Sequence, residues 1–228
     1  MRNVATTGKR IGYGWLYNWY AVNHASGLAP DGWRVPTQQD WRDMVSYIVD
    51  EYVDVNNDNV GGALKSTKNE WNSPNTNATD MFRFAALPGG RRDALGAFGF
   101  LNDVVNYWTS TETTSPYAVA RGISYDGAIL TEQSFIDKER GYSVRCIQDK
   151  SVGETDGDTG TLTDIDGNTY TWVVIGDHRW MAENLRTTKY KNGSTIPEIT
   201  DNTSWANDTT GARCAYNNDH YFVYPPQK

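Results

Sequence analysis

The stretch GYGWLYNWYAVNHASGLAPDGWRVPTQQDW, residues 12–41, places four tryptophans and three tyrosines within thirty positions. Its first part spaces apolar side chains as on one face of a short amphipathic helix. These side chains are Trp15, Leu16, Trp19, Tyr20 and Val22. Rings of this size are mostly buried in folded proteins, so we expect them to face a core. We likewise assign Trp33, Trp41 and Trp108 to the core rather than to a sugar-binding platform.

A second helix is predicted to begin at Thr37, near the end of the same stretch. Pro36 precedes a Thr-x-x-Asp pattern, in which Asp40 can complete a relative of the capping box. The apolar side chains that follow recur every three or four residues and form one buried stripe. They are Trp41, Met44, Val45, Ile48 and Tyr52. The stretch therefore predicts a helix, a loop and a helix.

From residue 106 the pattern becomes that of strands. Residues 106–112 read as a strand, and side chains alternate from 117 to 125. Asp126-Gly127 is then a strong hairpin signal, followed by a return strand over 128–135. A last strand is expected over 141–149, with one of its two faces in the core.

Residues 149–161 hold no large apolar side chain and read as a linker. Residues 161–185 predict three more short strands, separated by turns at Asp166-Gly167 and Gly176-Asp177. Glycine and asparagine are frequent, which favours loops. We therefore expect an α+β fold with two short helices, small antiparallel sheets and long ordered loops.

Composition excludes several kinds of partner. The net charge of −7 is spread along the chain without a block of either sign, so we expect no nucleic-acid partner. No stretch approaches the roughly 20 apolar residues of a membrane helix, and no charged-then-apolar leader is present, so neither membrane insertion nor a signal peptide is expected. Cys146 and Cys214 are read as two buried thiols or one disulfide.

The sequence offers no convincing catalytic or cofactor site. The three histidines are scattered without metal-ligand spacing, and motifs for nucleophilic or metal-assisted hydrolysis are absent. The DIDGN segment, residues 164–168, has its glycine at the wrong position for a calcium loop and reads as a hairpin turn. We therefore expect no enzyme activity, no metal and no cofactor.

Several motifs together resemble a known family. They include GWLYNWYAVN (14–23), GWRVPTQQDW (32–41), YWTSTE (107–112), GYSVRCIQD (141–149) and DIDGNTYTWVVIGDHRWMAENLRTTKY (164–190). The chain resembles the Fibrobacter succinogenes major paralogous domain, which is similar to the C-type-lectin-like fold of formylglycine-generating enzymes and phage variable proteins. Where family members often carry a cysteine before P-x-GW, this chain has Ala29, so the resemblance leaves Cys146 without its usual partner.

In that family the DIDGNTY block comes first, whereas here it comes last, so the resemblance implies a circular permutation. Residues 1–10 would form an N-terminal arm, 11–148 the C-terminal part of the family domain, and 162–228 its N-terminal part. The last part would complete the same fold across the linker. Tandem half-domains, or a swap that completes a neighbouring subunit, are the alternatives.

The resemblance to phage variable proteins points to recognition, because they differ most between the segments that match YWTSTE and GYSVRC. The hairpin there offers side chains suited to contact area and directional hydrogen bonds. The candidate ligand-binding residues are Tyr117, Arg121, Tyr125, Glu132, Ser134 and Phe135. Alternate residues of a hairpin must face the core, so some of these rings can be packing residues instead.

We therefore expect a ligand- or receptor-binding module, an adhesin on a phage tail or fibre that recognises a bacterial surface glycan or outer-membrane protein. Its location would be the virion or an extracellular surface, and its partners would include other virion subunits or further copies of itself. A structural decoration or connector domain of a virion or cell surface is the first alternative. A formylglycine-generating-like oxidase is the second.

Overall fold

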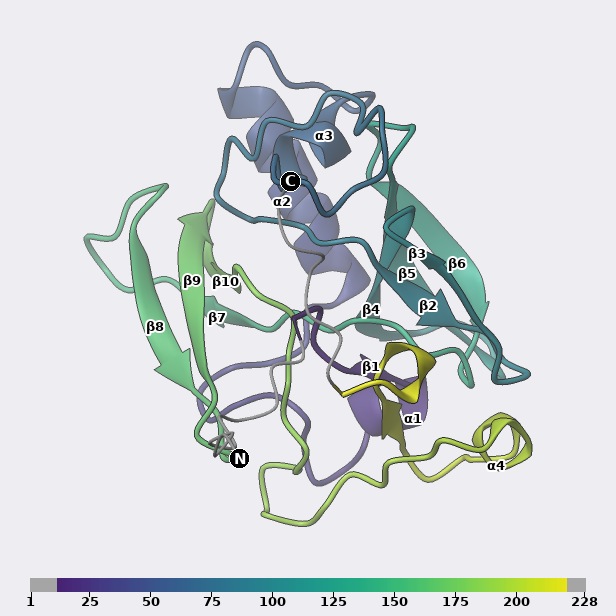
Figure 1. The fold of residues 1–228 in the computed structure, drawn as a ribbon. Helices are drawn as coiled ribbons and strands as arrows, with labels where there is room; N and C mark the ends of the chain where they lie inside the picture. Colours follow the sequence, from purple (N-terminus) through teal and green to yellow (C-terminus); the bar gives the residue numbers. More distant parts are fainter. Residues whose placement is uncertain (1–11, 221–228) are drawn as a thin grey trace, which may run out of the picture.

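The structure is a computed structural model that describes residues 12–220; the predicted arm, 1–10, and residues 221–228 lie outside the described part. The fold is mixed α+β, dominated by sheets with a few short helices (Figure 1). The helices are α1 (Trp19–Val22), α2 (Gln38–Glu51), α3 (Val60–Leu64) and α4 (Asn202–Ala206), with a 3₁₀ turn at Tyr216–Asn218. The strands are β1 (Leu16–Tyr17), β2 (Gly89–Arg92), β3 (Phe98–Leu101), β4 (Val104–Glu112), β5 (Tyr117–Ser124), β6 (Thr131–Asp137), β7 (Ile147–Asp149), β8 (Thr159–Thr163), β9 (Thr169–Ile175), β10 (His178–Met181) and β11 (Arg213–Cys214).

A five-stranded sheet carries the predicted hairpin. Its order is β3-β2-β4-β5-β6, and all neighbours are antiparallel except β2 and β4. The predicted strands over 106–112 and 117–125 are confirmed by β4 and β5. The return strand β6 begins at Thr131 rather than at residue 128, because residues 125–130 form a longer turn than the Asp126-Gly127 signal suggested.

A four-stranded antiparallel sheet has the order β7-β10-β9-β8. Strands β8, β9 and β10 confirm the three short strands predicted there, and Gly167 and Gly176 supply the positive φ that their turns require (80° and 63°). Strand β8 begins within the segment predicted as a linker. In the same segment the Asp156 carboxylate accepts hydrogen bonds from the Tyr47 and Tyr52 hydroxyls at 2.5 and 3.0 Å. The segment is therefore attached to α2.

The predicted helix from Thr37 is confirmed by α2, whose N-terminus has a full capping box between Thr37 and Asp40. Figure 1 shows α2 running between the four-stranded and five-stranded sheets. Its Trp41 is fully buried and contacts three rings, which include one from each of the two sheets. These rings are Phe84, Tyr107 and Trp180. The predicted burial of Trp33, Trp41 and Trp108 is confirmed, with exposed fractions of 7, 0 and 0 %.

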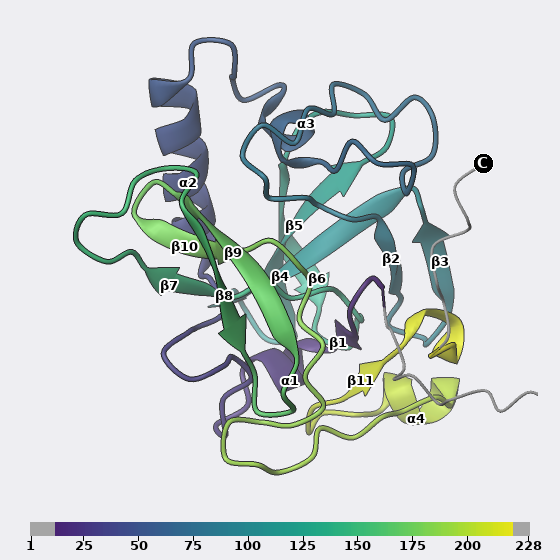
Figure 2. The same ribbon diagram turned by 60° about the vertical axis from the view of Figure 1, so that its left-hand side comes forward.

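The helix expected over residues 15–22 is wrong in its first half. Leu16 and Tyr17 form β1, which pairs with Cys214 and Arg213 of β11, and only Trp19–Val22 is helical. Figure 2 shows β1 beside β11. A partner strand almost two hundred residues away therefore overrides the local helical spacing.

The strand expected over 141–149 is regular only at β7, and the expectation that one of its faces lies outside the core is wrong. Residues 141–147 are all buried. The Trp108 amide donates to the Ser143 carbonyl at 3.0 Å, and the Leu185 amide donates to the Val144 carbonyl at 2.8 Å. Neighbouring segments bond to both edges of this stretch, and its alternating side chains are buried on both faces.

Candidate functional site

The β5–β6 hairpin holds all six residues singled out from the sequence. Tyr117 is paired with Asp137 at its open end, and Gly122 with Thr131 near its turn. Lys65, fully buried, holds the turn: its Nζ donates to the carbonyls of Ser124 at 3.1 Å and Gly127 at 2.9 Å. Burial lowers the pKa of Lys65 to about 8. The turn is thus fixed by a buried cation that the sequence reasoning did not select.

The inner face of the hairpin, which we define as the side covered by α2, holds Arg121 and Glu132. They face each other across the strands and form an ion pair at 2.7 Å. Glu132 also accepts from Arg42 of α2 at 2.7 and 2.9 Å, and from the Gln38 amide at 2.5 Å. Hydrogen bonds from Arg42 lower the pKa of Glu132, although partial burial opposes this. Both residues are therefore engaged within the protein.

The other four candidates divide between packing and exposure. Tyr125 is half-buried against the core cluster around Trp41. Tyr117 and Phe135 lie at the open end of the hairpin, with their ring centroids 6.2 Å apart in an edge-to-face contact. Phe135 is 70 % exposed, whereas Ser134 beside it is half-buried. The structure thus leaves Phe135 as the most accessible of the six.

The outer face of the hairpin carries a hollow of about 480 Å³, which we call the sheet hollow. Residues from four strands form one row there. Asn106 of β4 pairs with Gly122 of β5, which pairs with Thr131 of β6. Arg91 of β2 extends the row, because the preceding Gly90 pairs with Val105 of β4. Gln133, Asp58 and Asp126 lie farther along its walls. The hollow belongs to the opposite face from Arg121 and Glu132, because successive strand residues alternate.

Sequence reasoning missed the residues of this hollow. Asn106 lies in a predicted strand and Gln133 lies between two candidate residues, but both are amides outside any recognised motif. The signal that could have identified them is the alternation of side chains between the two faces of a strand. Asn106, Gly122 and Gln133 share a face once the register of the three strands is known.

Comparison with protein families gives one match. The sequence model of the Fibrobacter succinogenes major domain matches residues 2–148, more than half of the chain. The chain belongs to this family. Comparisons with curated proteins and with solved structures found no match. Strands β1 to β6, and with them both faces of the hairpin, lie within the matched part of this Fibrobacter succinogenes major domain.

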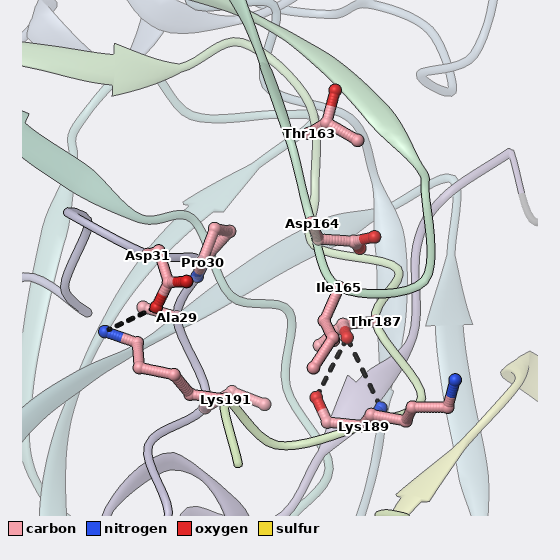
Figure 3. Close-up of a pocket in the computed structure, with 10 residues that line it drawn as sticks. Ala29, Pro30, Asp31, Thr163, Asp164, Ile165, Thr187, Lys189 and Lys191 are labelled. Carbon is pink, nitrogen blue, oxygen red and sulfur yellow. Dashed lines mark hydrogen bonds and ion pairs between the residues drawn. The ribbon is translucent and has the colours of Figure 1, made fainter. Parts of the chain in front are cut away.

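A second hollow of this family member, of about 160 Å³, lies between the 28–31 loop and the loops that precede β9 and follow β10 (Figure 3). Its charged groups already have partners. Lys191 reaches Asp31 at 3.7 Å, and Lys189 reaches Asp166 at 3.2 Å. The buried Asp164 accepts a hydrogen bond from the Tyr170 hydroxyl at 2.6 Å. This hollow therefore joins two parts of the chain and offers a ligand few free groups.

Two features of residues 12–220 of this family member concern metal binding and thiol reactivity. The same residues contain no group of three or more histidine, cysteine or acidic side chains that could hold a metal. Cys146 and Cys214 are both free and fully buried, and burial raises the pKa of both thiols, of Cys214 to about 12. Such thiols are poor nucleophiles. Within the same range no helix is both long enough and apolar enough to cross a membrane.

Proposed function

We propose that this chain is a recognition module which binds a bacterial surface glycan or protein through the β5–β6 hairpin. We further propose that it acts outside the cell, on a phage tail or fibre, alongside other virion subunits. Support for binding comes from the hairpin itself. A fixed turn, an exposed ring at the open end and a hollow on the outer face are the features of a rigid contact surface.

The sheet hollow is the observation that carries this proposal. Its volume lies in the range of ligand sites, roughly 300–1,000 Å³. Among residues 12–220 the Arg91 guanidinium has no carboxylate partner, and it stacks on Phe100 at 4.2 Å. On the inner face, by contrast, both arginines reach Glu132. Free hydrogen-bonding groups around a hollow favour a ligand.

The test is binding of the purified chain to whole bacterial cells and to an array of bacterial polysaccharides. We expect binding that falls when Gln133→Ala is introduced. The matched control is Lys191→Ala in the second hollow, which leaves the hairpin intact. Absence of binding to any cell or polysaccharide, with co-assembly with another virion protein instead, would overturn the adhesin proposal.

For the fold we propose a circularly permuted C-type-lectin-like domain. Pairing of β1 with β11 and of β7 with β10 supports it, because residues 178–214 complete sheets begun by residues 16–149. The test is a reordered chain, residues 150–228 followed by 1–149. We expect it to keep the circular dichroism spectrum and cooperative unfolding of the original. A reordered chain that fails to fold while the original folds would contradict permutation.

A connector role is the second candidate, and edge strand β6 favours it. Strand β6 ends the five-stranded sheet, and Phe135 on it is 70 % exposed. Exposed strand edges pair readily with other chains. If β6 binds a second subunit, Phe135→Lys will abolish co-assembly and leave polysaccharide binding unchanged, which separates the two functions.

A further inference from the structure

We infer that the sheet hollow binds an uncharged, hydroxyl-rich saccharide residue, held between Arg91 and Gln133 above the backbone of Gly122. The inference rests on the proposed recognition function and names the ligand class of that site. The proposed function leaves open whether the ligand is a glycan or a protein, and this inference chooses the glycan.

The row across the sheet sets the size of the site. Arg91, Asn106, Gly122 and Thr131 stand on four neighbouring strands. Strands lie about 4.8 Å apart, so the row spans roughly 14 Å. A cyclic sugar fits along such a row with polar groups at its rim and sheet backbone beneath it.

Gly122 makes the floor of the hollow. A Cβ added there would lie 2.6 Å from Gln133 Nε2, 2.9 Å from Asn106 Nδ2 and 3.0 Å from Thr131 Oγ1. Any other residue would therefore displace the two amides and the hydroxyl from their places around this point. The missing side chain lets three hydrogen-bonding groups converge on one spot.

One of these groups, the Asn106 side chain, keeps an unsatisfied acceptor among the described residues, whereas the Thr131 hydroxyl donates to the Gly122 carbonyl at 3.0 Å. Asn106 is only 2 % exposed, and its Oδ1 is enclosed and accepts no hydrogen bond from any residue in the 12–220 range. Its Nδ2 reaches Gln133 Oε1 at 3.4 Å, and Gln133 Nε2 reaches Thr131 Oγ1 also at 3.4 Å, both long contacts. Buried acceptors without partners are costly. A rotation of the amide with a ligand in the hollow would supply the missing partner.

Saccharide hydroxyls match this set of groups. Each hydroxyl both donates and accepts a hydrogen bond, and so does each amide side chain. The walls add one cation, Arg91, and two carboxylates, Asp58 and Asp126. This near-balance of charge disfavours a polyanion. Exposed Ile129, at 48 %, offers an apolar wall for the C–H face of a sugar ring.

The position of the hollow disfavours an extended peptide. Peptides that bind sheets add to an exposed edge, where backbone groups are unpaired. Here β4 and β5 lie inside the sheet and are paired on both sides. Backbone hydrogen bonds are thus unavailable on this face, and side chains must do the binding.

The test uses neutral gluco-, galacto- and manno-oligosaccharides, with oligosaccharides of uronic acids as the charged comparison, titrated by calorimetry and by saturation-transfer NMR. We expect a neutral oligosaccharide to bind. Gln133→Ala and Gly122→Ala should each weaken that binding about tenfold, the loss that corresponds to one or two hydrogen bonds. Phe135→Ala, at the open end of the hairpin, should change it less than about twofold.

Gly122→Ala can disturb the sheet. If the Gly122→Ala variant does not fold, the binding of Gln133→Ala tests the inference. Equal binding by wild type and Gln133→Ala, or binding of uronic acid oligosaccharides alone, would overturn the inference. If the wild type binds bacterial cells through a surface protein and none of the oligosaccharides, the recognition function stands and the saccharide inference fails. If it binds neither, both fail.

Discussion

The two faces of the β5–β6 hairpin use the same kinds of side chain in opposite ways. On the inner face, Arg121, Glu132 and Arg42 bond to one another and to Gln38. On the outer face, Arg91 has no carboxylate within the described chain, and the Asn106 Oδ1 atom accepts no hydrogen bond there. The ion pairs of the inner network hold the hairpin to α2, although the enclosed Arg121 Nε atom has no hydrogen-bond partner within residues 12–220. In the same range, Arg91 and Asn106 on the outer face form no such ion pair and are available to a ligand.

The difference shows that residue type alone does not mark a binding site in a sheet. Arg121 and Gly122 are consecutive, yet the arginine belongs to the scaffold and the glycine to the floor of the hollow. The alternation of strand residues separates the two roles. Substitutions on the inner face should therefore change stability, and substitutions on the outer face should change binding.

The largest effect is expected from Glu132→Ala. It leaves Arg121, 5 % exposed, without its carboxylate, and a buried charge stripped of its partner is strongly destabilising. We expect the free energy of unfolding to fall by about 2–4 kcal/mol, measured by urea denaturation. Gln133→Ala, next in the chain but on the outer face, should change it by less than about 0.5 kcal/mol. Equal losses would erase the distinction between the faces.

The variant Lys65→Met tests how much Lys65 stabilises the turn between β5 and β6. It removes the donor to the Ser124 and Gly127 carbonyls while keeping an apolar side chain of similar length. Unpaired buried carbonyls should lower the free energy of unfolding by about 2–3 kcal/mol and speed amide hydrogen exchange in residues 124–130. The exposed Lys68, replaced in the same way, is the matched control. A hydrogen-exchange pattern identical to that of the wild type would refute the clamp.

Asp40 probes how α2 is anchored beside the inner face. Burial would raise its pKa, but hydrogen bonds from Arg34 and Thr37 outweigh this and lower the pKa to about 2. In the unfolded chain the value is near 3.8, so this stabilisation is present above about pH 4 and is lost as the pH falls toward 2. We expect Asp40→Asn to cost about 1–2 kcal/mol at pH 7 and to reduce the acid sensitivity of unfolding.

Thermal unfolding followed by circular dichroism from pH 2 to 7 measures this dependence. Asp43→Asn, exposed on the same helix, serves as the control and should retain the pH dependence of the wild type. A wild-type-like acid transition in Asp40→Asn would show that other carboxylates set it.

The smallest effect on stability is expected from Phe135→Ala. The ring is 70 % exposed and makes an edge-to-face contact with Tyr117, so the change in free energy of unfolding should stay below about 0.5 kcal/mol. Chemical denaturation checks this. A loss above about 1 kcal/mol would mean that Phe135 belongs to the scaffold and not to the contact surface.

Local signals in the sequence were sufficient where an element is stabilised by its own residues. The capping box of Thr37 and Asp40 and the stripe that follows it predicted α2, and turn glycines predicted β8, β9 and β10. The hairpin was likewise predicted from local signals, the alternating strand residues and the Asp126-Gly127 turn. Of its six selected residues, Arg121 and Glu132 turned inward to each other, because a candidate list by residue type cannot assign faces without the register.

The amino-acid sequence by itself determined the family, the aromatic core and the elements whose hydrogen bonds close over short distances. Only the tertiary structure decided that Leu16 and Tyr17 form a strand with residues 213–214, that residues 141–147 are buried on both sides, and that Arg91, Asn106, Gly122 and Thr131 stand in one row. The physical reason is the same in each case. Pairing between distant segments fixes register and burial, and no local pattern contains the identity of the partner strand.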